Sequence, residues 1–215
     1  SDAQILEQFA SDPSKLSVEE MLYGANRLVK DDATRQKWNE TIAKQYPSDY
    51  RALNNLAQQA ISKGDVNAAE SYLKQAAQVS KNASEVNTNL ALMSLKSGDV
   101  AKAETYLAKG SGSNTFKEVM GNLNIAKGNY TQAASDLAGV NTNSAALAQI
   151  LAKDYTSAKT TLSKIKNADA TTSYLQAVLA ARTGDSSALS SSLKNAIQQD
   201  GTLAARAAKD LEFAK

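Results

Sequence analysis

Apolar residues recur along the chain at the spacing of one helix face. After Tyr50, the residues Leu53, Leu56, Ala57 and Ala60 stand at relative positions i, i+3, i+4 and i+7, which is the pattern of an amphipathic α-helix. Stretches of this kind, about a dozen residues long, alternate with short polar turns over most of the sequence. The pattern predicts an all-α protein built from consecutive helices.

A short phrase marks the turns between these helices. It consists of a glycine, an acidic or amide residue and, three or four residues further on, an alanine. Glycine can end a helix in the left-handed conformation without steric cost, and Asp or Asn can cap the helix that follows. The alanine is small enough to stand where two helices cross closely. The five copies begin at Gly64, Gly98, Gly128, Lys153 and Gly184, with lysine replacing glycine in the fourth.

The spacing of the phrase indicates the type of repeat. Gly64 and Gly98 lie 34 residues apart, which is the length of a tetratricopeptide repeat (TPR). Residues 50 to about 140 resemble TPR repeats in their small and large packing positions. Later intervals are shorter, and the stretch 110–113 (Gly-Ser-Gly-Ser) truncates the second repeat. The resemblance implies a TPR-like α-solenoid, a right-handed superhelix of antiparallel helix pairs.

The whole chain is therefore expected to form a single TPR-like helical repeat domain, 1–215. Terminal repeats of a solenoid need caps that close the exposed core, and the last segment is expected to be such a capping helix. The expected parts are divergent N-terminal helices at 1–49, repeats at 50–83, 84–113, 114–140, 141–168 and 169–200, and the cap at 201–215.

Four segments resemble a narrower group of proteins than TPR proteins in general. They look like the TPR region at the C-terminal end of cell-envelope proteins of the Bacteroidetes. This resemblance implies a periplasmic or outer-membrane-associated location and a further domain upstream of the chain. It supplies no catalytic motif. The segments are 16–23, 46–55, 145–151 and 209–215.

Composition and charge narrow the function classes. The 24 basic and 22 acidic residues give a net charge of +2, which is too balanced to favour nucleic acid or an anionic membrane as the main partner. No run of apolar residues is long enough to span a bilayer, so we expect no direct membrane insertion. The sequence has no cysteine and no histidine, which removes the usual nucleophile, general base and metal ligands. We therefore expect no enzyme activity, no cofactor and no metal site.

TPR arrays usually bind ligands along the concave face, which is lined by the first helix of each pair. Amides on that face could grip an extended peptide, because each carries donors and an acceptor; the alternative is that they only keep the face soluble. A clamp for a C-terminal carboxylate is not expected, because Thr115 and Val119 stand where lysine and arginine would be needed. The predicted peptide- or partner-binding residues are Asn54, Asn55, Gln58, Asn89, Leu92, Asn122 and Ile125.

Aromatic residues allow two interpretations. Trp38, Tyr46 and Tyr50 surround Pro47 and could form a ligand platform, but they are better explained as a plug between the N-terminal helices and the first repeat. Tyr130 and Tyr155, which each follow one of the turns, are expected in the core.

The predicted function is a non-catalytic scaffold that binds a peptide segment or domain of another protein. One alternative is a structural spacer or assembly module, with possible self-association through the irregular later repeats. Another is association with peptidoglycan or another glycan, for which amides and tyrosines are a faint indication.

Overall fold

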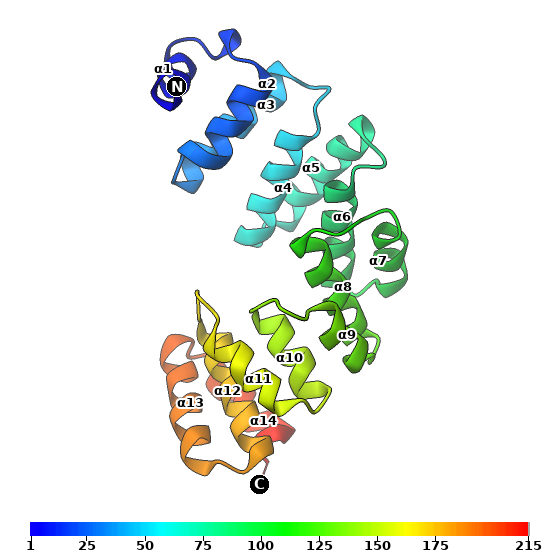
Figure 1. The fold of residues 1–215 in the computed structure, drawn as a ribbon, viewed down its shortest axis with the longest axis vertical. Helices are drawn as coiled ribbons and strands as arrows, with labels where there is room; N and C mark the ends of the chain where they lie inside the picture. The colour runs from blue at the N-terminus through cyan, green and yellow to red at the C-terminus, as the bar shows by residue number, and fades with distance from the viewer. Residues whose placement is uncertain (215) are drawn as a thin grey trace. The chain divides into compact units, whose positions relative to one another are not determined.

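The computed structural model describes residues 1–214, and this part of the chain is helical without any β-strand. Adjacent helices pack in antiparallel pairs, as expected for a TPR-like solenoid (Figure 1). The chain divides into two compact units, Ser1–Ser111 and Gly112–Lys215. The division falls inside the stretch 110–113, which the sequence predicts to truncate the second repeat. Each unit is described separately.

Unit 1 contains an N-terminal group of helices followed by two regular pairs. Within it, α4 packs against α3, α5 and α6, and α6 packs against α7. The elements are α1 (Asp2–Ser11), the 3-10 turn η1 (Pro13–Lys15), α2 (Val18–Tyr23), the π-turn η2 (Gly24–Leu28), α3 (Asp32–Gln45), α4 (Arg51–Lys63), α5 (Val66–Val79), α6 (Ser84–Lys96) and α7 (Val100–Leu107).

The turn phrase forms as the sequence predicts. Gly64 takes a left-handed conformation with φ of 76°, and the Asp65 side chain accepts a hydrogen bond from the backbone N–H of Ala68 at 3.1 Å. Lys153 adopts the same left-handed conformation with φ of 66°, so the fourth copy makes the same turn without glycine. Asn129 is the exception, because its side chain makes no capping bond to α9.

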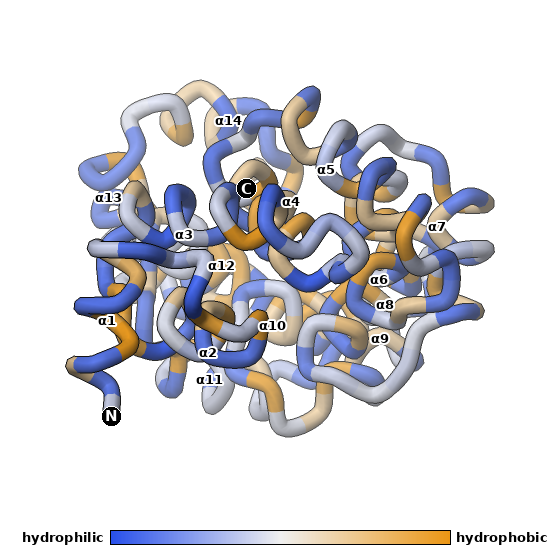
Figure 2. The backbone as a smooth tube through the Cα atoms, turned by 90° about the horizontal axis from the view of Figure 1, so that it is seen from above, coloured by the Kyte–Doolittle hydropathy of each residue, from blue (hydrophilic) through white to orange (hydrophobic). Residues whose placement is uncertain are grey.

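The core of unit 1 is built from leucine and alanine. Ala57 of α4 and Ala69 of α5 are fully buried, and so is Leu73. Residues with methyl side chains allow two helices to approach closely at their crossing, and the leucines fill the space beside it. In the tube of Figure 2, hydrophobic and hydrophilic stretches alternate along the chain, as an amphipathic pattern requires. The sequence pattern therefore predicts the core of this unit correctly.

Trp38 belongs to the packing of the N-terminal helices. Its ring stacks on Phe9 with centroids 3.6 Å apart, and only 4% of the residue is exposed. A Cβ atom on Gly24 would lie 2.3 Å from the Trp38 ring, so glycine is required where η2 crosses it. Trp38 shares a core cluster with Ala52 of α4. The plug interpretation is correct for Trp38, and the ligand-platform interpretation is wrong for it.

In the described part of unit 2 there are three helix pairs, the first two with shorter helices than the third, and a single final helix. Within it, α10 packs against α8, α9, α11 and α12, and α12 packs against α13. The elements are α8 (Asn114–Ala126), α9 (Tyr130–Asp136), α10 (Asn143–Leu151), α11 (Tyr155–Ser163), α12 (Ala170–Thr183), α13 (Ser186–Gln199), α14 (Leu203–Lys209) and the 3-10 turn η3 (Leu211–Phe213).

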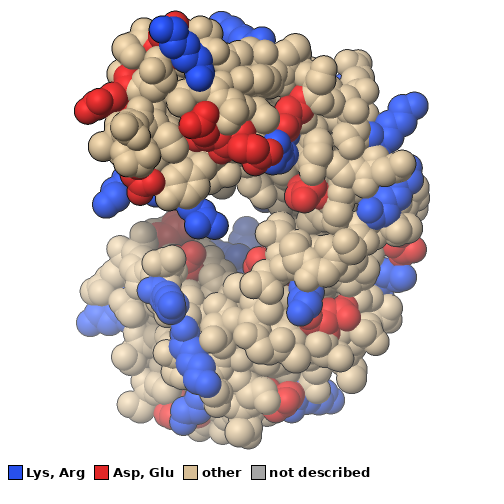
Figure 3. Space-filling view, turned by 45° about the horizontal axis from the view of Figure 1, so that its top comes forward, with Lys and Arg blue, Asp and Glu red and all other residues tan. Residues whose placement is uncertain are grey.

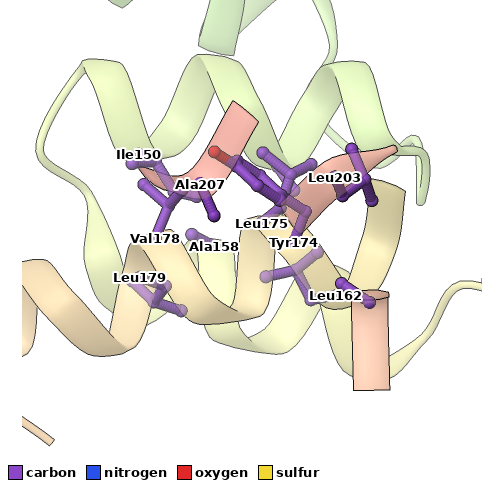
Figure 4. Packing of buried hydrophobic residues seen from close by; sticks show 11 residues of the cluster. Ile150, Ala158, Leu162, Tyr174, Leu175, Val178, Leu179, Leu203 and Ala207 are labelled. Carbon is purple, nitrogen blue, oxygen red and sulfur yellow. The ribbon is translucent and has the colours of Figure 1, made fainter. Parts of the chain in front are cut away.

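The final helix caps the core of unit 2. Figure 4 shows side chains of α12 gathered against Leu203 and Ala207 of α14. The expected single capping helix is in fact two elements, because Asp210 has an extended backbone (φ −77°, ψ 122°) that ends α14 and caps η3.

Tyr130 corrects another expectation, since it is 37% exposed rather than in the core. It is the first residue of a short helix, α9, and its ring therefore lies at the helix end.

Candidate functional site

A polar pocket opens on the first-helix face of unit 1. We use this name for the face formed by the first helices of successive pairs, which here are α2 with η2, α4 and α6. The pocket has a volume of about 290 Å³ and lies between η2, α3 and α4. Its lining residues are Asn26, Asp32, Arg35, Asn55, Gln58, Gln59, Ser62 and Lys63.

Two of the predicted binding residues line this pocket. Gln58 is exposed, and its amide faces solvent. Asn55 is half-buried, and its Nδ2 donates to Asn26 Oδ1 at 3.2 Å and to Asn39 Oδ1 at 3.1 Å. Asn39 is fully buried, and its own Nδ2 donates to the carbonyl of Arg35 at 2.9 Å. The network fixes the orientation of Asn55 at the pocket wall.

Gln59 adds a buried acceptor that sequence reasoning missed. Its Nε2 donates to the carbonyl of Asp32 at 3.2 Å, while its Oε1 is buried and has no hydrogen-bond partner among the described residues. Buried polar atoms are nearly always hydrogen-bonded to protein or water. Because this oxygen is closed to solvent, a ligand in the pocket can bond to it only if the Gln59 side chain turns. The helical spacing Asn55, Gln59, Lys63 is the signal that could have identified this wall.

Charged groups of both signs border the pocket. Arg35 Nη1 pairs with Asp32 at 2.8 Å, and its other nitrogens donate to the carbonyls of Ala25 and Val29. Lys63 Nζ donates to Gln36 Oε1 at 3.0 Å. The two cations have neutral or acidic partners, so the pocket is polar without a strong net charge. It suits a ligand with both donors and acceptors, such as a peptide backbone.

Asn54 and Asn89, two other predicted binding residues, lie inside the protein. They are 6% and 2% exposed, and Asn89 Nδ2 donates to Asn54 Oδ1 at 2.8 Å. This bond joins α4 to α6 across their interface. Each amide therefore has a structural partner, and direct contact of these two residues with a ligand stays a prediction that the geometry does not favour. Leu92 on α6 is half-buried.

The binding residues predicted in unit 2 are partly involved in the packing of that unit. Asn122 and Ile125 of α8 are both half-buried. Ile125 packs against the cluster that contains Leu137 and Ala145. On the same helix, a Cβ atom on Gly121 would lie 2.4 Å from Leu137, which shows how closely α8 approaches the end of α9. A binding role for Asn122 and Ile125 stays a prediction.

The first-helix face of unit 2, formed by α8, α10, α12 and α14, carries a second cluster that sequence reasoning missed. The Tyr174 hydroxyl donates to Asp210 Oδ2 at 2.5 Å, and Arg182 Nε donates to both carboxylate oxygens of Glu212, at 3.1 and 3.0 Å. Burial and the bond to Asp210 raise the pKa of Tyr174 to about 12. The hydrogen bonds to Glu212 raise the pKa of Arg182 above its ordinary value. Tyr174 therefore remains a neutral phenol that donates a hydrogen bond over a wide pH range.

A second hollow lies beside this cluster. It has a volume of about 280 Å³ and is lined largely by apolar side chains of α10 and α12, including Leu147, Leu151 and Val178. Arg182, Asp210 and Glu212 line its polar end.

The charged side chains of the surface are dispersed. On the face seen in Figure 3, basic and acidic residues form small groups separated by uncharged surface. Within residues 1–214 no group of acidic side chains is arranged to hold a metal ion. No helix in the same range is long and apolar enough to cross a membrane.

Comparison with known proteins agrees with this geometry. A family model described as tetratricopeptide repeat matches residues 60–117, and the search of curated proteins found no match. The Cut9–Hcn1 heterotetramer of the APC/C has a chain with a TM-score of 0.71 and 13% identity, over 99% of this chain and 44% of that one. This chain thus spans less than half the length of that relative.

Two further structures resemble the chain over most of their own length. A tetratricopeptide repeat protein from Parabacteroides merdae has a TM-score of 0.62 and 11% identity, over 93% of this chain and 85% of that one. PilW, described as a widely conserved type IV pilus biogenesis factor, has a TM-score of 0.59 and 15% identity, over 99% and 94%.

The fold thus defines the chain as a TPR-like α-solenoid. The family model identifies tetratricopeptide repeat sequence in residues 60–117, and the solved structures show the same fold over nearly the whole chain. Repeat proteins of this kind are typically non-catalytic, and the fold supports a role as a protein–protein interaction scaffold with a protein partner.

Proposed function

We propose that the chain binds an extended segment of another protein in the polar pocket of unit 1. The observation that carries the proposal is the open polar pocket itself, which has the exposed Gln58 and Ser62 at its rim and Asn55 and Gln59 in its wall. All four residues lie on α4. The partner segment contacts the exposed side chains of Gln58 and Ser62 at the rim.

The chemistry of the pocket favours a peptide over a small charged ligand. Amides, a hydroxyl and an internally paired arginine offer donors and acceptors in similar number. An extended peptide presents the same mixture along its backbone. The charged lining residues Asp32, Arg35 and Lys63 nearly balance one another, so the pocket offers a strongly charged ligand little net attraction.

We also propose a periplasmic or outer-membrane-associated location, with this region attached to a domain upstream. The support is the resemblance of four sequence segments to the TPR region of Bacteroidetes envelope proteins. Fold similarity to a type IV pilus biogenesis factor is compatible with the proposal, although similarity at this identity concerns the fold alone. Fractionation of cells that express the tagged natural protein tests the location. Recovery in the cytosol alone would contradict it.

Crosslinked capture from an envelope extract tests the binding site. The native chain is compared with a Gln58→Ala/Ser62→Ala variant, whose two changes lie at pocket-lining positions that are exposed. Gln78→Ala changes an amide of α5 that is also exposed and lies outside the pocket, and it is the matched control. We expect a partner that the native chain and the control retain and the pocket variant loses.

Other outcomes assign the chain differently. Equal capture by all three proteins places the interaction outside the pocket and overturns the proposed site. Capture of no partner favours the spacer or assembly role. In that case sedimentation of the chain over a range of concentrations shows whether it associates with itself.

A further inference from the structure

We propose that the segment Asp210–Phe213 occupies a peptide-binding site on the first-helix face of unit 2, as an internal and displaceable ligand. The site takes a partner segment of the same chemistry, with two carboxylates two residues apart and an aromatic residue directly after the second. The proposal concerns residues of unit 2 only and does not rest on the pocket of unit 1.

The first carboxylate is bound by an aromatic and cationic pair. Tyr174 is 4% exposed, and its hydroxyl donates to Asp210 Oδ2. The Arg206 guanidinium lies 4.9 Å from the centre of the Tyr174 ring. The cation thus supports the site electrostatically and leaves the hydroxyl to form the directional bond.

The second carboxylate is bound by a guanidinium whose orientation is fixed. Arg182 Nη1 donates to the carbonyl of Ile150 on α10 at 3.1 Å, which sets the plane of the group. Its Nε and Nη2 then face Glu212, with Nη2 donating to Glu212 Oε1 at 2.5 Å. A guanidinium held in this way recognises a carboxylate by shape as well as by charge.

The aromatic residue completes the recognised pattern. Phe213 meets the Tyr174 ring edge-on, with centroids 5.5 Å apart and planes at 74°. It is half-buried against the core cluster of the unit. Tyr174 therefore contacts two parts of the segment at once, a carboxylate through its hydroxyl and an aromatic ring through its own ring.

The segment is the less buried part of the cap, which is why it can be displaced. None of the residues of η3 is buried, and Leu211 is 87% exposed. The capping contacts come from Leu203 and Ala207 of α14, which are both buried. Loss of η3 from the surface would leave this cap in place. The site would then be open beside the hollow lined by Leu147 and Val178 of the neighbouring helices.

A binding measurement on the whole chain tests the proposal. The probe is a fluorescent capped peptide with the sequence of residues 209–214, Lys-Asp-Leu-Glu-Phe-Ala. The receptor is either the native chain or an Asp210→Asn/Glu212→Gln/Phe213→Ala variant, in which the internal segment loses its three contacts. We expect at least tenfold tighter binding of the peptide by the variant. A control peptide with Asn and Gln in place of the two acids should bind neither protein.

Further variants separate recognition from general loosening. Adding Arg182→Gln to the release variant should return peptide affinity to the native level or below. Adding Gln58→Ala/Ser62→Ala in unit 1 should leave it unchanged, so a failure of the unit 1 pocket and a failure of this site are distinguishable. Hydrogen exchange of residues 210–214 must rise in the release variant while exchange in α12 and α14 stays low.

Three results would overturn the proposal. The first is no gain in peptide affinity although exchange shows that the segment is released. The second is a gain that persists with Arg182→Gln. The third is unchanged exchange of residues 210–214, which would show that the segment is a fixed part of the cap.

Discussion

The two units use the same turn phrase and similar cores, but their first-helix faces differ. In unit 1, Asn55, Gln58 and Gln59 line an open polar pocket. In unit 2, the corresponding face already holds two carboxylates of the chain itself, bound to Tyr174 and Arg182. The difference teaches that the helix-pair repeat fixes the scaffold, while a few side chains on one face decide whether that face is open or occupied.

The largest expected effect comes from the part that the units share. Leu73→Ala in unit 1 and Leu162→Ala in unit 2 remove leucines that are 0% and 4% exposed. Each should lower the free energy of unfolding by about 2–5 kcal/mol. Urea denaturation measures the loss, and hydrogen exchange shows which unit is affected. Losses below about 1 kcal/mol for one of them would show that the two cores are not equivalent.

Alkaline pH should distinguish the two faces. The pKa of Tyr174 is raised to about 12 by burial and by the bond to Asp210, so the folded state retains the proton longer than the unfolded chain. The stabilisation is therefore complete below the ordinary tyrosine pKa of about 10 and is lost as the pH rises through 12, by an amount on the order of 2 kcal/mol. Tyr174→Phe should lose less stability between pH 9 and 12 than the native chain. Parallel losses would contradict the assignment to Tyr174.

Close helix approach can be compared at two glycines. A Cβ atom would lie 2.3 Å from Trp38 at Gly24 and 2.4 Å from Leu137 at Gly121. Gly24→Ala and Gly121→Ala should each cost about 1–3 kcal/mol through overpacking. The leucine can change rotamer more readily than the stacked indole can move, so the Gly24 variant should lose more. Thermal unfolding measures both, and the reverse order would contradict the argument.

Asn89→Ala tests the structural role of the buried amide pair. It leaves Asn54 Oδ1 buried without its donor and should cost about 1–2 kcal/mol. Asn54→Leu/Asn89→Leu removes both partners and should restore part of that loss. Chemical denaturation of the three proteins measures the difference. A single variant as stable as the native chain would show that the amides are free for another role.

The smallest effect on stability is expected at the rim of the unit 1 pocket. Gln58→Ala/Ser62→Ala changes exposed positions and should alter the free energy of unfolding by less than about 0.5 kcal/mol. Its effect should appear only in partner capture. A large loss of stability would mean that these residues support the fold rather than a ligand.

The sequence predicts the features that depend on neighbouring residues. The Gly64 turn with its Asp65 cap follows from local conformational preferences, and the leucine and alanine positions of the core follow from helical spacing. The burial of Asn54 and Asn89 could not be predicted in this way. Their bond joins residues 35 positions apart, and a small rotation of α4 against α6 decides whether an amide faces solvent or its neighbour.

The cluster at Asp210 and Glu212 was missed for a similar reason. In the sequence these residues look like ordinary polar positions of a capping helix. Their contacts depend on the chain leaving the helical conformation at Asp210 and folding back to Tyr174 and Arg182, which lie 36 and 30 residues away. The identity of the partner could not be predicted from one sequence either, because exposed amides serve solubility and recognition equally well.

Lys153 has a consequence for how such repeats are detected. It holds a left-handed conformation that glycine holds at Gly64, Gly98, Gly128 and Gly184, at a cost of roughly 1–2 kcal/mol that the surrounding helices absorb. The geometry of the turn thus persists where its characteristic glycine is replaced by another residue. A family model depends on residue identities, and it matches residues 60–117. Comparison of the coordinates with a solved structure extends over nearly the whole chain. Repeats of this kind can therefore become undetectable in sequence while their structure is retained.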